Sequence, residues 1–136
     1  MKIRKPVHDN WATPKELYNL LDSEFNFDFD PCPLNYTVDG LAIEWGKSNF
    51  INPPYSRKLK EAFINKALEE SKKGKLCVLL LPVSTSTKIF HDVVLPNGEI
   101  RFFRGRPKFS ENGTEKPTSG QPDNMLVIFN KQEVLI

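Results

Sequence analysis

The stretch Leu76-Cys77-Val78-Leu79-Leu80-Leu81-Pro82 is an unbroken apolar run that ends at a proline. Such a run is typical of a strand that is buried on both faces of a sheet, and Pro82 is expected to end it because proline cannot donate to the ladder. The run is far shorter than the ~20 residues that span a bilayer. The sequence therefore predicts a central strand, around which the other elements are arranged.

A helix and a second strand precede this central strand. Apolar residues at helical spacing among lysines and glutamates predict an amphipathic helix over about 57–72: Leu59, Phe63, Ala67 and Leu68. Phe50-Ile51 is a brief apolar strand that must end at Asn52, because two prolines follow it. A strand, a helix and a strand in this order predict a parallel crossover.

Further elements are expected toward both ends of the chain. Thr13 followed by Pro14 predicts an N-cap and the first residue of a helix over about 14–24. The alternation of residues 27–30 predicts a short strand that Pro31 ends. Downstream we expect a short helix that reaches about residue 93, strands at 100–103 and 125–129, and irregular segments at 34–47 and 108–123. The fold expected is α/β, with about five mostly parallel strands.

Composition limits the size and the class of the protein. Its 136 residues, 39% of them hydrophobic, predict a single domain over 11–136 behind a flexible basic arm at 1–10. The net charge of +2 allows contact with nucleic acid but is too small for binding by charge alone. Without a signal peptide pattern or a membrane segment, we expect a cytoplasmic protein with no membrane contact. Cys32 and Cys77 are expected to be buried free thiols, and no metal site is predicted.

The motif Asn52-Pro53-Pro54-Tyr55 follows the predicted strand at the edge where ligands bind in open parallel sheets. The Asn52 side-chain oxygen and the Pro53 carbonyl can accept both hydrogens of one planar amine, which turns the nitrogen lone pair toward an electrophile. The prolines fix φ and so hold that carbonyl rigidly. Tyr55 offers a face on which a base can stack, worth about 1–3 kcal/mol. The alternative is an ordinary turn, because the same residue types favour turns.

This motif looks like the catalytic motif of the amino-methyltransferases, which act on adenine in DNA or RNA and on glutamine in proteins. Together with four other segments in the same order, it makes the chain resemble the phage-type DNA adenine N6-methyltransferases over residues 11 to about 129. These segments are Trp11-x-Thr13-Pro14, Phe27-x-Phe29-Asp30-Pro31-Cys32, Leu41-x-x-x-Trp45 and Gly105-Arg106-x-x-Phe109. Each is short, so the resemblance rests on the order of all five.

The resemblance implies a fold, a cofactor and a substrate. It implies an abbreviated Rossmann-like methyltransferase fold, S-adenosylmethionine as cofactor, and double-stranded DNA from which an adenine is flipped out. In a phage- or prophage-encoded enzyme the place of action would be the host cytoplasm, and a homodimer is an allowed assembly. The residues implied are Asn52, Pro53, Pro54 and Tyr55 for catalysis; Trp11, Thr13, Pro14, Asp30, Pro31, Cys32 and Asn52 for the cofactor; and Tyr55, Ser56, Arg104 and Arg106 for the substrate.

The cofactor half of the pattern is shortened. No glycine follows Asp30-Pro31, where cofactor loops usually place one for close backbone approach. Only 21 residues separate Asp30 from Asn52, where a complete methyltransferase holds two more strand-helix units and an acidic ribose ligand. Asp39 or Glu44 could replace that ligand, although acidic residues in a turn are usually solvated. The shortened site also fits a non-catalytic nucleic-acid-binding module, and the acceptor motif alone fits RNA adenine or protein glutamine.

Three groups of residues have two interpretations each. Thr13 and its neighbours fit either a cofactor contact or a helix cap with an aromatic staple. The hydroxyls of residues 84–87 fit a substrate contact, although helix capping explains them. Basic residues that alternate with phenylalanines suit either phosphate binding or a charged edge strand: Arg101, Arg104, Arg106 and Lys108.

Overall fold

The computed structural model describes residues 11–33, 39–105, 110–111 and 123–130. The expected basic arm at 1–10, most of the expected loop at 108–123 and Arg106 lie outside these residues. Among the described residues, no helix is both long and apolar enough to cross a membrane.

The main sheet has four strands within the described residues, in the order β2-β3-β6-β4. These strands are β2 Ser48–Ile51, β3 Leu76–Pro82, β6 Asn124–Asn130 and β4 Glu99–Phe102. β2 pairs with β3 in parallel, whereas β6 is antiparallel to both β3 and β4. The prediction of about five mostly parallel strands is therefore wrong. An apolar run such as that of β6 has the same sequence pattern in either direction, so its orientation could not be predicted.

Two shorter strand pairings accompany this sheet: one lies next to β2, and the other is separate from the sheet. The predicted strand at 27–30 is reduced to one parallel bridge between Phe29 and Asn49. The backbone nitrogen of Phe50 donates to the Phe29 oxygen at 3.0 Å, which places the end of this segment beside β2. Two-residue strands, β1 Trp11–Ala12 and β5 Ser110–Glu111, form a separate antiparallel pair.

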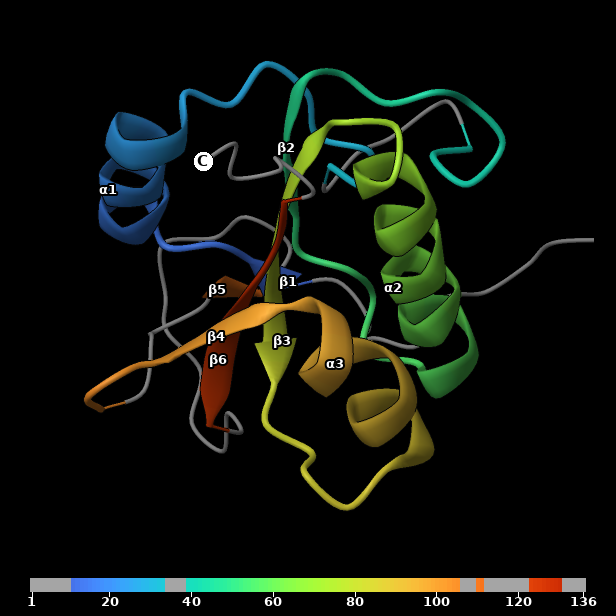
Figure 1. The fold of residues 1–136 in the computed structure, drawn as a ribbon. Coiled ribbons are helices and arrows are strands. Elements are labelled where there is room, and N and C mark those ends of the chain that lie inside the picture. The colour runs from blue at the N-terminus through green and yellow to red at the C-terminus, as the bar shows by residue number, and fades with distance from the viewer. Residues whose placement is uncertain (1–10, 34–38, 106–109, 112–122, 131–136) are drawn as a thin grey trace, which may run out of the picture.

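Helices cover both faces of the sheet. α2, Arg57–Ser71, lies on one side and α1, Lys15–Phe25, on the other (Figure 1). On the α2 side, Phe63, Ile64 and Ala67 pack in one core cluster with alternate residues of the central strands. On the α1 side, Leu21 packs with Phe50 and other residues of the opposite parity. The predicted helix at 57–72 and the parallel pairing across it are confirmed.

The start of one helix and the end of another differ from the prediction. Pro14, not Thr13, is the N-cap of α1, and no side-chain hydrogen bond caps this helix. Pro14 has the extended ψ of 134°, so the helical hydrogen bonds begin one residue later than expected. After β3, Thr87 caps a helix that runs through a π-turn, Phe90–Val94, into α3, Leu95–Asn97. This helix is therefore longer than predicted.

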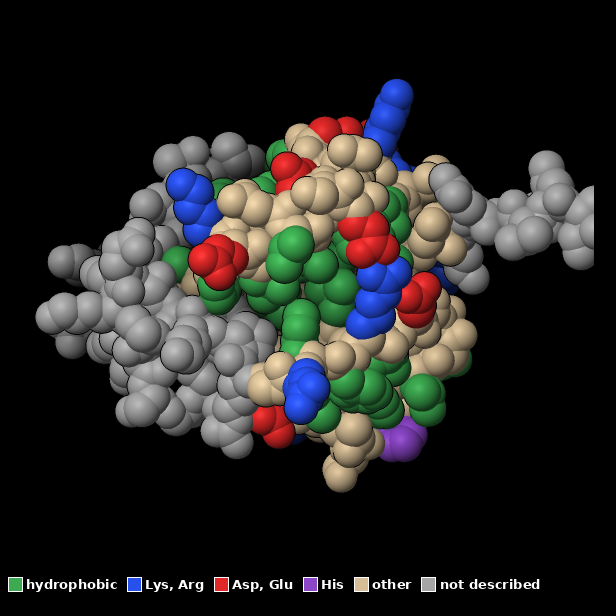
Figure 2. Space-filling view, turned by 90° about the vertical axis from the view of Figure 1, so that its left-hand side faces the viewer, with side chains coloured by type: hydrophobic (Ala, Val, Ile, Leu, Met, Phe, Trp, Pro, Cys, Tyr) green, Lys and Arg blue, Asp and Glu red, His purple; other side chains and the backbone are tan. Residues whose placement is uncertain are grey.

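The face that carries α1 has hydrophobic side chains at its centre, with acidic and basic side chains around them (Figure 2). Leu20 of α1 is 70% exposed. Arg101 of β4 joins this helix to the edge of the sheet through an ion pair with Glu24 at 2.8 Å, and it lies over the ring of Phe25.

Candidate active site

Asn52 lies where β2 ends, and its side chain meets the segment that precedes α1. The Asn52 Nδ2 donates to the Thr13 Oγ1 at 3.0 Å. This contact takes the donor end of the amide, so it sets which end of the Asn52 side chain is Oδ1, the acceptor. Thr13 thus contacts Asn52, and its side chain makes no capping hydrogen bond to α1, so the helix-cap interpretation of Thr13 is wrong.

The segment Asp30-Pro31-Cys32 lies next to the acceptor motif. The Cys32 thiol is buried and donates to the main-chain oxygen of Asn52 at 3.4 Å. Both Cys32 and Cys77 are buried free thiols, as predicted. Pro53 and Pro54 are buried as well, so packing holds the backbone of the motif in addition to the fixed φ of the prolines.

A glycine does approach this segment, although it comes from farther along the chain than expected. A Cβ on Gly40 would lie 1.9 Å from the carbonyl oxygen of Pro31, so only glycine fits at this position. Close backbone approach is thus achieved across the chain, between residues 31 and 40, and not within the loop itself. Asp39, whose carboxylate accepts from the Leu41 nitrogen at 2.9 Å, directly precedes this contact.

Asp30, two residues before Cys32, is an ionisable residue with a shifted pKa. Loss of solvent raises the pKa of its carboxyl to about 6, although the hydrogen bond from the Cys32 nitrogen acts in the opposite direction. A carboxylate that is short of solvation is stabilised by a cation, and S-adenosylmethionine carries both an ammonium and a sulfonium group. Asp30 therefore fits the cofactor that the resemblance implies.

Tyr55 lies beside Asn124, a residue that no sequence motif indicates. Its hydroxyl is buried and interacts with the side chain of Asn124, the first residue of β6. Burial raises the pKa of Tyr55 to about 12, while the nearby Asn124 side chain acts in the opposite direction, so the hydroxyl stays protonated. A polar residue before a buried apolar run was the available signal for Asn124.

Other predicted site residues are less tightly placed. Ser56 is the N-cap residue of α2 and lies directly after Tyr55. Arg104 is exposed just beyond β4. The neighbouring Arg101 is engaged with Glu24 and Glu99, which fits the charged edge strand, since β4 is the last strand of the described sheet. Glu44 pairs with Lys73 at 3.1 Å, near the end of α2.

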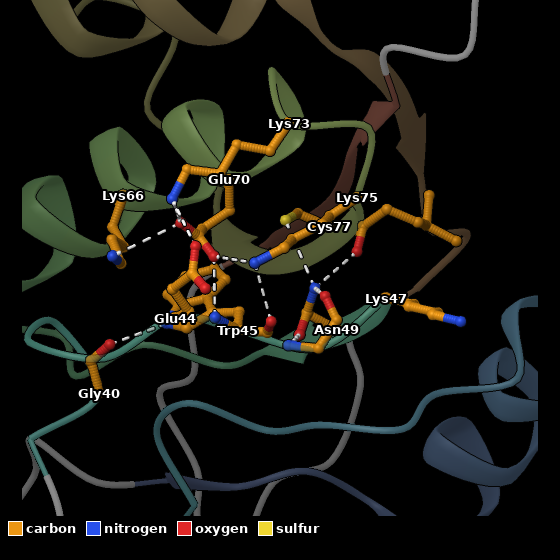
Figure 3. A network of polar contacts seen from close by, with 12 residues as sticks. Gly40, Glu44, Trp45, Lys47, Asn49, Lys66, Glu70, Lys73, Lys75 and Cys77 are labelled. Carbon is orange, nitrogen blue, oxygen red and sulfur yellow. Dashed lines mark hydrogen bonds and ion pairs between the residues drawn. The ribbon is translucent and has the colours of Figure 1, made fainter.

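A polar network lies at the opposite end of the strands, around Glu70 and Trp45 (Figure 3). The Trp45 nitrogen donates to the Glu70 Oε1 at 2.8 Å, and its indole Nε1 donates to the Gly40 oxygen at 2.8 Å. Trp45 thus connects the buried end of α2 to the glycine that contacts Pro31. The Asn49 amide fixes the next residues by hydrogen bonds to both main-chain groups of Gly46.

Comparison with known proteins agrees with the motifs. The family model described as DNA N-6-adenine-methyltransferase (Dam) matches residues 1–134. A protein named DNA N-6-adenine-methyltransferase, from Haemophilus phage HP1, is 32% identical over 143 residues, which cover 93% of this chain and 81% of the phage protein. No solved structure matches the chain significantly. The family and the relative confirm the resemblance found in the sequence: the chain belongs to the DNA N-6-adenine-methyltransferase family and is an enzyme of that kind.

Proposed function

We propose that this enzyme transfers the methyl group of S-adenosylmethionine to the exocyclic nitrogen of an adenine that is flipped out of double-stranded DNA. The observation that carries the proposal is the double constraint on Asn52. Thr13 holds the donor end of its side chain at 3.0 Å, and Cys32 holds its main-chain oxygen at 3.4 Å. Such a residue is preorganised to accept a hydrogen bond without further loss of entropy.

The acceptor pair consists of the Asn52 Oδ1 and the Pro53 carbonyl. The Cys32 thiol contacts the carbonyl of Asn52, and the main-chain acceptor assigned to the substrate is the following carbonyl, on Pro53. Two acceptors on one amine draw its lone pair out of conjugation with the ring, which makes a poor nucleophile reactive. The nitrogen becomes positively charged as it bonds to carbon, and its proton then becomes acidic enough to leave to water.

Tyr55 is assigned to the base itself. Its hydroxyl is buried beside Asn124, so packing limits the movement of the ring. A ring that is already fixed provides a stacking surface for an extruded base at a smaller entropy cost than a mobile one. Ser56 and the exposed Arg104 are assigned to the DNA around that base, and Arg106 belongs to the same proposal although it lies outside the described residues.

The cofactor is assigned to the segments that meet Asn52. Asp30, Pro31 and Cys32 would hold it from one side, and Trp11, Thr13 and Pro14 from the other. When bound, S-adenosylmethionine supplies an electrophilic methyl group. The desolvated carboxyl of Asp30 favours a cationic group, and Asp39 is a better candidate than Glu44 for the ribose because it precedes the contact between Gly40 and Pro31.

An abbreviated Rossmann-like fold is part of this proposal. β2, β3 and β4 point in one direction, because β3 and β4 are both antiparallel to β6. The bridge at Phe29 adds a further parallel contact outside β2. Asp30 and Asn52 thus follow neighbouring chain segments at one edge, which is where open sheets of this kind bind ligands.

Incubation of the purified protein with radiolabelled S-adenosylmethionine and DNA, RNA or protein tests the substrate. We expect label on adenine N6 of double-stranded DNA and none on RNA or on protein glutamine, because family membership favours DNA over these alternatives. Sequencing of DNA from cells that express the protein, by a method sensitive to N6-methyladenine, would then give the target site. Label on RNA or protein alone, or the absence of cofactor binding in the presence of DNA, would overturn the proposal.

A further inference from the structure

A cavity of about 450 Å³ lies beside the acceptor motif and contains none of its residues. It is formed between the first turns of α2 and the chain that follows β3. Figure 1 draws both of these segments in the lower half of the view. α2 begins two residues after Tyr55, and Met125 in the cavity wall directly follows Asn124, the partner of the Tyr55 hydroxyl. The cavity therefore adjoins the position assigned to the flipped base.

The inner wall of the cavity is apolar. Four of the residues that line it are almost completely buried: Ile64, Leu81, Phe90 and Met125. The volume lies within the ~300–1,000 Å³ that is usual for ligand sites. A flat apolar group such as a nucleobase would be removed from water on this surface.

The rim of the cavity is basic and carries hydroxyl groups. Arg57 and Lys60 come from α2, and Lys88 comes from the opposite wall. Glu61 is the acidic residue in the lining, and it pairs with Arg57 at 3.1 Å. The Arg57 side chain is 78% exposed, so the pair is weak and Arg57 can exchange Glu61 for a phosphate. Three cations against one carboxylate leave the rim positive.

The chemistry of an apolar wall below a basic rim matches a nucleotide. We propose that this cavity binds the nucleotide that neighbours the target adenine on the same strand, with its base against the apolar wall and its phosphate at Arg57, Lys60 and Lys88. The proposal rests on the assignment of the target adenine to Tyr55, and it makes the cavity a determinant of sequence preference. Ser84 and Ser86 supply hydroxyls at the mouth, whereas Thr87 is used in the cap of the following helix.

Removal of the rim charges tests the binding of the phosphate. The probe is a duplex oligonucleotide that carries the target site found by sequencing, and DNA binding is measured over a range of salt concentrations. For the triple variant Arg57→Ala, Lys60→Ala, Lys88→Ala we expect binding about tenfold weaker or more, and a salt slope smaller by about 0.9 for each phosphate that the rim no longer neutralises. Calorimetry without DNA should show unchanged affinity for S-adenosylmethionine.

A charge-matched control separates local contacts from general electrostatics. Lys47, Lys58 and Lys72 are exposed and lie outside the cavity lining. Their triple alanine variant removes the same charge and should keep most of the salt slope. Equal slopes and affinities in the two triple variants would overturn the proposal, while methylation by the wild-type protein would still support the proposed function.

A second experiment tests whether the neighbouring base contacts the apolar wall of the cavity. An abasic residue is placed in turn at each position next to the target adenine, and binding is compared between the wild type and Ser86→Trp, which fills the mouth of the cavity. One abasic position should weaken binding to the wild type several-fold and have no further effect on Ser86→Trp. If no neighbouring position does so, the nucleotide does not enter the cavity and the proposal is wrong.

Discussion

One buried carboxyl group lies at each end of the strands of the sheet, and the pKa values of the two groups are shifted in opposite directions. At the carboxyl ends of the strands, burial raises the pKa of Asp30 to about 6. At the amino ends, burial also acts to raise the pKa of Glu70, but hydrogen bonds from Lys75, Lys73 and the Trp45 nitrogen outweigh it and lower the pKa to about 2. Glu70 is completely buried, and Lys66 adds a third lysine at 3.6 Å (Figure 3).

The opposite pKa shifts indicate that one end of the strands serves mainly stability and the other mainly function. The network around Glu70 stabilises the turn at residues 40–46 and connects it to α2. The opposite edge keeps an incompletely solvated carboxyl and a buried tyrosine hydroxyl. Groups whose pKa is shifted by desolvation are typical of functional sites, because a ligand can supply the missing interaction. Substitutions at the two edges should therefore have different effects.

The largest effect is expected from Asn52→Ala. Loss of one acceptor of the pair should lower the rate of methyl transfer by about 10²–10³-fold, as is usual when a preorganised hydrogen-bonding group is removed. The melting temperature should change little, because the residues at the carboxyl ends of the strands contribute less to stability than the Glu70 network at the amino ends. The measurement is kcat at saturating DNA and cofactor, with Asn65→Ala, an exposed residue of α2, as the control. Unchanged turnover in Asn52→Ala would contradict the acceptor mechanism.

Glu70→Gln should have the converse effect. Removal of the charge leaves three lysines without their common partner, so we expect a loss of about 3 kcal/mol in the free energy of unfolding at pH 7. Urea denaturation measures this loss, and kcat of the folded fraction should remain close to that of the wild type. Because the folded pKa of Glu70 is lowered, its contribution is present above pH 4.5 and should disappear as the pH falls toward 2.

The neighbouring Glu69 provides a matched control for this substitution. It lies on the same turn of α2 but is exposed. Glu69→Gln should change the free energy of unfolding by less than about 0.5 kcal/mol. Equal stability of the two glutamine variants would show that the Glu70 network does not stabilise the protein at the amino ends of the strands.

Much of the fold could be predicted, because its elements have strong local patterns. β2, α2, β3 and β6 were placed to within about two residues by their apolar periodicity. The direction of β6 could not be predicted, since strand pairing depends on contacts distant in the sequence. The segment at 27–30 has the alternation of a strand, yet Phe29 is its one bridged residue and Pro31 ends it at once.

The site was predicted unevenly for a related reason. Asn52 and Asp30 could be proposed from the sequence because each follows an apolar segment and belongs to a motif. Asn124 and Glu70 were missed, because each acts through partners far away in the sequence. A glutamate in an amphipathic helix is usually solvated, and its burial becomes apparent when Trp45 and the lysines are placed around it. Thr13 fitted a helix cap equally well until its contact with Asn52 was known.

Asp30→Asn should increase stability and abolish cofactor binding. The raised pKa means that ionisation of Asp30 destabilises the folded protein as the pH rises from about 4 through 6. At pH 7 the asparagine variant should therefore be more stable by up to about 2 kcal/mol, and the difference should vanish near pH 4. Urea denaturation at both values measures this. Calorimetry should show a large loss of affinity for S-adenosylmethionine.

The neighbouring Asp28 is the matched control for this variant. Its exposed carboxylate accepts hydrogen bonds from the main-chain nitrogens of Lys47 and Ser48, so Asp28→Asn should not increase stability. In the wild type, the affinity for the cofactor should fall as the pH is lowered through about 6, where Asp30 becomes neutral. An affinity that stays constant from pH 8 to pH 5 would remove Asp30 from the cofactor site.

The smallest effect is expected at Thr13, and it distinguishes the two remaining roles of this residue. Thr13→Val keeps the shape of the side chain but removes the oxygen that accepts from the Asn52 Nδ2. If Thr13 orients Asn52, kcat should fall about tenfold, which corresponds to one ordinary hydrogen bond, while the KM for the cofactor stays constant. Thr13→Ser retains the hydroxyl and should recover most of the activity. The opposite split, a raised KM with unchanged kcat, would make Thr13 a cofactor contact and would leave the orientation of Asn52 to Cys32 and the prolines.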